Sequence, residues 1–357
     1  MIVAGMNGFG RFGVHLLKYW LDRSDQASFR IDYINDDTLS LSSAYHIILN
    51  DLYVVFDKFD VRLAEDAIII SKSSGASHLI TYTNSPPSQI PWLGKPHMLF
   101  ECSGKETVAQ MRRFYLSGGT KLVIISATSW DADKTLIYGF NHRQFSRSHN
   151  IISYGSCTVN AYVPLADFLH RKFGVVDSDV HVIHNTPAYL LKGNMTLKRK
   201  ACTLQVSAGR LLPFLDAQNF LVKYTGVPYT GVSMIDLRFR LKSQIDADVI
   251  LGELEDSFRG GELKGLYEFD DCDNGPQKFN CSTYSAVFIK NAVNVLGHNV
   301  YFHAYCDTEN SANRFFDLAD YVSIRNHSLL PRYDTIDRDA KTKKRFDDPE
   351  NACQATV

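Results

Sequence analysis

The sequence predicts a chain of two parts: an α/β part built on a parallel sheet, and then an α+β part whose sheet is mostly antiparallel. Over about the first 150 residues, strand-like and helix-like segments alternate, and the strand-like runs are continuously apolar, as in strands buried on both faces. Residues 235–242 instead alternate apolar and charged side chains, which is typical of an antiparallel strand with one face in water. A glycine-rich turn joins the first strand to the first helix.

The elements of the first part follow in order. A short apolar strand covers residues 1–6, and a helix with apolar residues at helical spacing follows the glycines at 13–23. Three more strands are predicted at residues 29–36, 97–104 and 120–129, with a helix at 106–119 between the last two. We therefore expect a first domain at residues 1–156.

The second part begins with a long helix at 158–174. Strands are then predicted at 179–187, 235–242, 284–290 and 299–306, and an amphipathic helix that ends on glycine at 246–261. We expect a catalytic domain at 157–310, a final helix at 311–323 that packs back on the first domain, and a polar extension at 324–357.

The composition excludes several classes of function. The chain has 357 residues and a formal net charge of −1, and no basic tract marks a nucleic-acid surface. The longest apolar runs are too short to span a bilayer, and the N-terminus has no leader pattern, so a cytoplasmic protein is expected. The seven cysteines include no C-x-x-C pair, so we expect neither a disulfide framework nor a bound metal.

The stretch MNGFGRFG places Gly8, Gly10 and Gly13 in the spacing G-x-G-x-x-G, between an apolar strand and an amphipathic helix. This context is typical of a Rossmann dinucleotide-binding domain. Gly8 permits a tight turn, Gly10 lets the backbone approach a pyrophosphate, and Gly13 lets the helix pack closely on the sheet. A glycine turn without a ligand is the alternative.

Asp36 ends the second predicted strand, 36 − 13 = 23 positions after the last glycine of the motif. A carboxylate at this place accepts hydrogen bonds from an adenosine ribose and repels a 2′-phosphate. Asp37 beside it adds negative charge. The sequence therefore predicts NAD rather than NADP as the coenzyme.

Cys157 lies between a strand-like run and an apolar helical run, where it is either a nucleophile or a small buried thiol. A nucleophilic cysteine needs a base within hydrogen-bond reach. His181 and His184 lie three residues apart on one predicted strand, so they point to opposite faces. Only one of them can face Cys157, and the strand pattern does not say which.

Several motifs give the chain a resemblance to phosphorylating glyceraldehyde-3-phosphate dehydrogenases. NGFGRFG resembles that family's NGFGRIG, and GSCTVN is close to its nucleophile motif ASCTTN. Further similar stretches are IND, PSQIPW, KLVIISATS, YGFNH, GVPYTGVSMIDLRFRL and GELKGLYEF. The resemblance runs in unbroken order from residue 1 to about 323, and implies a Rossmann domain, NAD and a homotetramer.

The resemblance also implies roles for particular residues. Cys157 would attack an aldehyde, and His184, 184 − 157 = 27 residues further on, would stabilise its thiolate and take the hydroxyl proton during oxidation to a thioester. Phosphate or water would then release the acyl group. The implied coenzyme contacts are Gly8, Gly10, Arg11, Phe12, Gly13, Asp36, Ser103, Gly104, Ser126 and Asp307, and the implied substrate contacts are Ser156, Thr158, Thr186 and Thr203.

The chain departs from the family mostly at anion-binding positions. Gly226 stands where the family has a phosphate-binding arginine, and Pro187 stands where it has a threonine. The family's STGAA is matched by ACTLQ, with Ala201, Cys202 and Thr203 leading. In the nicotinamide pocket, Asp307 replaces an asparagine. We therefore expect poor activity on glyceraldehyde 3-phosphate; the alternatives are a different aldehyde or acyl acceptor, or a catalytically weak NAD-binding protein.

Overall fold

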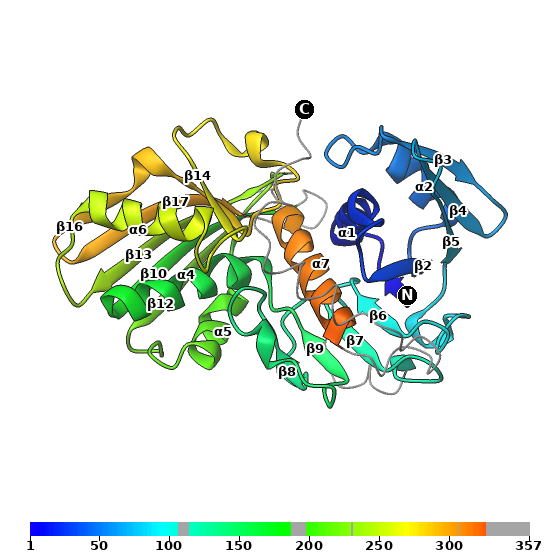
Figure 1. Ribbon diagram of the computed structural model, residues 1–357, viewed down its shortest axis with the longest axis horizontal. Helices are drawn as coiled ribbons and strands as arrows, with labels where there is room; N and C mark the ends of the chain where they lie inside the picture. The colour runs from blue at the N-terminus through cyan, green and yellow to red at the C-terminus, as the bar shows by residue number, and fades with distance from the viewer. Residues whose placement is uncertain (106–113, 187–197, 230, 307, 326–357) are drawn as a thin grey trace.

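The computed structural model describes residues 1–105, 114–186, 198–229, 231–306 and 308–325 (Figure 1). Within these ranges the chain forms two β-sheets with helices packed against them. The strand order is β3-β4-β5-β2-β1-β6-β7-β9-β8 in the first sheet and β11-β12-β10-β13-β17-β15-β14 in the second, where β16 also pairs with β17. Asp307, Pro187, most of the predicted helix at 106–119 and the tail from 326 lie outside the described residues.

The centre of the first sheet is parallel, as predicted from its apolar strands. Its parallel strands are β1 (Ile2–Asn7), β2 (Phe29–Asn35), β6 (Met98–Glu101), β7 (Leu122–Ile125), β8 (Lys134–Thr135) and β9 (Ile151–Ser153). The strands β6, β7 and β9 are buried along their whole length, which explains why they read as continuous apolar runs. Helices α1 (Arg11–Arg23) and α2 (Leu41–Asn50) follow β1 and β2.

One edge of the first sheet is antiparallel, and its hairpins were not predicted from the sequence. There β3 (Phe59–Leu63), β4 (Ala67–Lys72) and β5 (Ser77–Thr83) pair antiparallel, and β5 joins the rest of the sheet by pairing parallel with β2. The physical reason is the length of the connections. Residues 64–66 and 73–76 are too few for the crossover that parallel neighbours need, and suit hairpins.

The second sheet is mostly antiparallel, as predicted. Among the strands of the described residues, only β10–β12 and β14–β15 pair parallel. On β13, Ile235, Leu237 and Phe239 are at most 2% exposed, while Asp236 and Arg238 on the other face are half-buried, so the predicted alternation is confirmed. The strands are β10 (Val175–Asn185), β11 (Lys198–Arg199), β12 (Phe220–Val227), β13 (Ser233–Leu241), β14 (Tyr267–Asp270), β15 (Ala286–Ile289), β16 (Asn294–Leu296) and β17 (Asn299–Cys306).

Three helices accompany the second sheet: α4 (Cys157–Phe173), α5 (Thr203–Leu211) and α6 (Ala247–Arg259) (Figure 1). Their apolar side chains and the buried faces of the strands form one core, separate from the core of the first sheet. Short 3-10 turns occupy η1 (Pro87–Gln89), η2 (His142–Gln144), η4 (Pro276–Phe279) and η5 (Lys290–Ala292).

The final helix α7 (Thr308–Arg325) packs back on α1, as expected. Phe315 lies fully buried in the first core, with its ring 5.4 Å from that of Phe12 and 5.3 Å from that of Phe100. Arg23 of α1 donates to Asp317 at 3.1 Å. The helix is longer than the predicted 311–323 at both ends. Among the described residues, no helix combines the length and the apolar composition of a membrane span.

Candidate active site

The glycine turn after β1 leaves open space at the start of α1. Gly8 has φ +100°, and a Cβ there would overlap the backbone of Ser103. A Cβ on Gly13 would overlap the carbonyl oxygen of Gly8, so α1 can lie this close to β1 only with glycine. An added Cβ on Gly10, in contrast, meets no atom within 4 Å. The open space lies beside the first-turn N–H groups, where a pyrophosphate would bind.

We expect Gly10→Ala and Gly13→Ala to fail in different ways. Gly13→Ala should lower the melting temperature by about 3–10 °C, because the added methyl group meets backbone that cannot move aside. Gly10→Ala should leave the melting temperature within about 2 °C of the wild type and weaken NAD binding by about tenfold or more. Thermal unfolding and NAD titration of both variants would check this. Unchanged NAD affinity in Gly10→Ala would contradict a coenzyme site at this turn.

Arg11 and Phe12 are the first two residues of α1, and the first backbone bond of the helix runs from Val14 N–H to Gly10 O at 3.0 Å. The Arg11 guanidinium forms an ion pair with Asp51, and the Phe12 ring packs against the first core. Both side chains therefore already have contacts within the protein. Only their backbone N–H groups are placed to meet a phosphate, and helix starts favour such contacts.

Asp36 follows β2 at the same edge of the sheet and is 7% exposed. Its Oδ1 accepts from Thr38 N–H at 2.9 Å, from the Thr38 hydroxyl at 2.7 Å and from Leu39 N–H at 2.9 Å, while Oδ2 accepts only from Phe9 N–H at 2.7 Å. Burial acts to raise the pKa of Asp36, but these hydrogen bonds outweigh it and hold the pKa below its usual value. A carboxylate oxygen with a single donor keeps a lone pair for a ribose hydroxyl.

Asp37 should repel a 2′-phosphate less than the sequence suggested, because its negative charge is partly neutralised. Its carboxylate forms an ion pair with Lys105, at 2.8 and 2.9 Å. Asp36 forms no ion pair with any cation among the described residues, so we expect the discrimination against a 2′-phosphate to depend on its charge.

We expect Asp36→Ala to weaken NAD binding by about tenfold to a hundredfold, which is the usual contribution of a charge-assisted hydrogen bond. NADP should lose less affinity, because the repulsion of its 2′-phosphate disappears with the carboxylate. Titration of both coenzymes against the wild type and Asp36→Ala measures this, with Asp37→Ala as the matched control that keeps the preference. Tighter binding of NADP than of NAD by the wild type would refute the assignment.

Two further predicted coenzyme residues, Ser103 and Ser126, lie beside Glu101, whose carboxyl group is buried. Ser103 donates to Glu101 from its N–H at 2.8 Å and from its hydroxyl, and Ser126 N–H donates to the Glu101 carbonyl at 2.9 Å. Asn7 donates to the same carboxyl at 2.7 Å. Burial raises the pKa of Glu101. Gly104 follows with φ +69°. The network holds the ends of β1, β6 and β7 together at the edge where the glycine turn lies.

Cys157 is the first residue of α4. The chain leaves β9, turns at Gly155 with φ +86°, and enters the helix through Ser156, whose hydroxyl accepts from Val159 N–H at 3.4 Å. A serine at this position caps the helix. The thiol therefore stands at a helix N-terminus, where the dipole favours the thiolate.

The structure brings His184 to Cys157. The Cys157 Sγ lies 3.6 Å from the His184 Nε2, and the His184 Nδ1 lies 2.6 Å from the carbonyl oxygen of Asn185. Because a carbonyl only accepts, Nδ1 carries a proton and Nε2 faces the sulfur. His181 lies on the other face of β10, with its Nε2 3.2 Å from the Thr225 hydroxyl. The geometry thus agrees with the choice of His184.

A second aromatic ring supports this histidine. Tyr224 on β12 stacks on His184, with the ring centroids 5.4 Å apart and the planes at 26°. No pattern in the sequence marks Tyr224. Its position next to His184 depends on the parallel register of β10 with β12, which pairs residues 42 positions apart, such as Val182 with Tyr224 and His184 with Gly226.

Hydroxyl groups predicted to bind substrate lie beside Cys157, where the N-termini of α4 and α5 meet. The Ser156 Oγ is 3.3 Å from the Thr158 Oγ1 and accepts from the Thr203 hydroxyl at 3.4 Å. Cys202, at the start of α5, has its sulfur 3.8 Å from the Thr158 Oγ1. Burial, and then the neighbouring Cys157, raise the pKa of the Cys202 thiol. A raised pKa leaves less of the Cys202 thiol ionised near neutral pH.

Thr186 is not part of this group. Its N–H donates to Val227 O at 2.8 Å and the residue is 7% exposed. Among the described residues, no hydrogen bond joins it to Cys157 or His184.

Gly226 is buried and lies between two strands at the site. On β12 it pairs with His184 of β10 on one side and with Lys198 of β11 on the other. The side chain expected at this place in the family is thus missing immediately beside His184. Pro187, another position that differs from the family, lies outside the described residues.

Comparisons with known proteins bear on the family to which the chain belongs. No protein-family model matches the chain. The chain is 30% identical over 353 residues to glyceraldehyde-3-phosphate dehydrogenase 1 of Giardia intestinalis, across 90% of this chain and 98% of the relative. It is 28% identical to the plasmid-encoded glyceraldehyde-3-phosphate dehydrogenase of Cupriavidus necator, across 89% and 97%, and to glyceraldehyde-3-phosphate dehydrogenase 1 of Bacillus cereus, across 91% and 99%.

The chain combines a Rossmann-type sheet and its glycine turn with a second sheet, where a cysteine at the start of α4 meets a histidine of β10. This combination defines an NAD-dependent oxidoreductase. The extent of the similarity then fixes the family. The chain belongs to the glyceraldehyde-3-phosphate dehydrogenase family.

Proposed function

We propose that this protein oxidises an aldehyde with NAD through a thioester on Cys157. The observation that carries the proposal is the 3.6 Å contact between the Cys157 sulfur and the His184 Nε2, with the imidazole fixed by the Asn185 carbonyl. A thiol at a helix N-terminus beside such a base is the arrangement that activates a cysteine nucleophile.

The residues of this chain account for each proton in the reaction. His184 takes the proton of Cys157, and the thiolate attacks the carbonyl carbon to form a hemithioacetal oxyanion. The Cys157 N–H and the protonated Nε2 of His184 are placed to donate to that oxygen. NAD, when bound, supplies the hydride acceptor. As the carbon is oxidised, His184 holds the hydroxyl proton, and the acyl group stays on sulfur as a thioester.

The substrate can differ from that of the family, because the anion-binding positions of this chain differ from the family's. Gly226 offers no side chain where an arginine would bridge two phosphates, and an arginine fork is a main source of charge-assisted phosphate binding. Cys202 stands at the start of α5, among the hydroxyls that would meet an anion. These observations favour a different aldehyde, or release of the acyl group by water, as the second candidate function. A catalytically weak NAD-binding protein is the third.

One experiment separates these candidates. A panel of phosphorylated and unphosphorylated aldehydes is assayed for NADH production, in the presence and absence of phosphate and arsenate. Turnover that needs phosphate or arsenate indicates acyl transfer to an oxyanion, whereas turnover without either indicates hydrolysis. The dehydrogenase proposal fails if no aldehyde in the panel yields NADH while NAD still binds and the Cys157 thiol is unreactive at neutral pH.

We expect the wild type to be a poor glyceraldehyde-3-phosphate dehydrogenase, with kcat/KM below about 10⁴ M⁻¹s⁻¹. Restoring the cation with Gly226→Arg should raise this value, since loss of a charged partner typically costs about 2–5 kcal/mol of binding. Lys223→Arg, on the exposed part of the same strand, is the matched control that should change nothing. Ordinary efficiency in the wild type would show that another residue binds the phosphate.

The assembly and the division of the chain are proposals as well. We propose a homotetramer, as the family resemblance implies, and a boundary between two domains near residue 156. The two separate hydrophobic cores support the boundary, with Phe315 and its neighbours on α7 completing the first. Light scattering after gel filtration measures the assembly. The cytoplasmic location expected from the sequence stays a prediction.

A further inference from the structure

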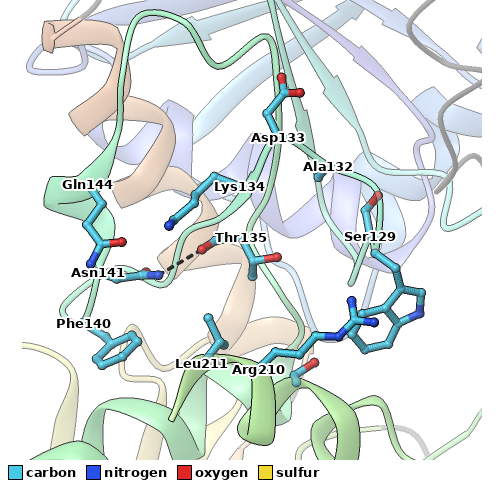
Figure 2. A pocket seen from close by; sticks show the side chains of 12 residues that line it. Ser129, Ala132, Asp133, Lys134, Thr135, Phe140, Asn141, Gln144, Arg210 and Leu211 are labelled. Carbon is cyan, nitrogen blue, oxygen red and sulfur yellow. Dashed lines mark hydrogen bonds between the residues drawn. The ribbon is translucent and has the colours of Figure 1, made fainter. Parts of the chain in front are cut away.

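A pocket of about 320 Å³ lies between the segment 129–144 and the helix α5 (Figure 2). The segment contributes β8 and the turn around Phe140, and α5 contributes Ser207, Arg210 and Leu211. None of the residues predicted to bind coenzyme or substrate lines this pocket. It is therefore separate from the site at Cys157.

The charge in the pocket is positive. Figure 2 shows Lys134 on one side and Arg210 on α5 on the other. Neither cation forms an ion pair within the part of the chain that the structure describes. The nearby Asp133 carboxylate points away from the Lys134 ammonium and accepts from the N–H groups of Asn150 and Ile151 at 2.7 and 2.8 Å. Two unpaired cations at a hollow favour an anionic group.

Apolar surfaces stand beside these cations. Trp130 is 48% exposed, and the Arg210 guanidinium lies 4.4 Å from the centre of its ring. Phe140 and Leu211 also line the pocket. An exposed tryptophan held by a cation offers a flat surface to a planar ligand.

A hydroxyl adds a further polar contact. Ser207 lines the pocket from α5, and the residue as a whole is 4% exposed. In the described ranges its hydroxyl forms no hydrogen bond within the protein, and it is not one of the fully buried polar atoms without a partner. It is therefore open to a ligand in the pocket.

We propose that this pocket binds a small organic anion, a carboxylate or a phosphate monoester on a planar apolar body. Lys134 and Arg210 hold the charged group, Ser207 donates to it, and Trp130 with Phe140 contacts the body. The same helix begins at Thr203, whose hydroxyl donates to Ser156 beside Cys157, so a ligand here touches an element of the catalytic site without entering it.

Tryptophan fluorescence provides the test. Of the three tryptophans, Trp20 and Trp92 are 1% exposed, so only Trp130 meets solvent. Benzoate, phenyl phosphate and their neutral analogue benzyl alcohol are titrated into protein whose Cys157 has been blocked with iodoacetamide, and calorimetry repeats each titration. We expect saturable quenching by at least one anion and none by benzyl alcohol. The tighter anion tells whether a carboxylate or a phosphate is the preferred group.

The variants assign the binding to this pocket. Lys134→Met and Arg210→Gln should each weaken the anion by about tenfold or more, as expected for loss of a charge-assisted hydrogen bond. Lys264→Met removes the same charge at an exposed position away from the pocket and should bind as the wild type does. The proposal is overturned by the absence of saturable binding of either anion, by equal binding of benzyl alcohol, or by unchanged affinity in Lys134→Met.

Discussion

Replacement of the nucleophile, Cys157→Ser, is expected to lower kcat/KM for aldehyde oxidation by at least about 10³-fold while NAD affinity stays unchanged. A serine hydroxyl beside His184 is almost wholly protonated at neutral pH, and it cannot form the thioester. The fold should tolerate the change, because serine fits the first turn of α4 as well as cysteine does. Steady-state kinetics with the best aldehyde of the panel, together with NAD titration, measures both effects.

Cys202→Ser is the matched control for this prediction. Its sulfur lies beside Thr158, but burial keeps the thiol protonated, so the variant should retain more than a tenth of the wild-type rate. Turnover of a tenth or more in Cys157→Ser, or a larger loss in Cys202→Ser than in Cys157→Ser, would contradict the assignment of the nucleophile.

The histidine variant should have the next largest effect. In His184→Asn the sulfur of Cys157 loses the base that lies 3.6 Å away, so less of the thiol is ionised near pH 7. We expect iodoacetamide to alkylate Cys157 about tenfold more slowly or worse, and the rate to recover as the pH rises toward the ordinary range of a thiol. Alkylation rates between pH 6 and 9, read by peptide mass spectrometry, would show this.

His181→Asn serves as the control, because it changes the same residue type on the same strand but on the opposite face. Its alkylation profile should match that of the wild type. If His181→Asn slowed the reaction more than His184→Asn, the opposite face of β10 would meet Cys157. The proposed mechanism would then be wrong.

Features that depend on neighbours along the chain could be predicted from the sequence. The spacing of Gly8, Gly10 and Gly13 between an apolar strand and a helix predicted the turn that the structure contains. Gly8 has a positive φ, and a Cβ on Gly13 would overlap the carbonyl oxygen of Gly8 within the same turn. The alternation on β13 predicted which face is buried, because side chains alternate with a period of two in any strand.

Features that depend on pairing between distant segments could not be predicted in this way. The antiparallel edge β3–β4–β5 was missed, since no glycine-rich two-residue turn marked its hairpins. Tyr224 was missed because its contact with His184 follows from the register of β10 with β12. The repulsion of a 2′-phosphate by Asp37 was overestimated. Its ion-pair partner Lys105 lies 68 positions away in the sequence and could not be predicted.

The choice between the two histidines shows what the sequence determines and what only the folded chain determines. Strand periodicity established only that His181 and His184 point to opposite faces. The packing of α4 decides which face meets Cys157, and that is a property of the folded chain; family resemblance supplied the answer before the geometry did. The natural aldehyde could not be predicted from the sequence either. Gly226 has no side chain, so this position does not indicate which group of the substrate it meets.

The most direct test of the account is to look for the acyl-enzyme. Wild-type protein is mixed with NAD and the best aldehyde of the panel in the absence of phosphate, quenched in acid within one turnover, and digested for peptide mass spectrometry. We predict one acyl group per chain, on the peptide that contains Cys157, formed together with one equivalent of NADH. NADH formation with no acyl group on Cys157, or with the acyl group on Cys202, would contradict the account.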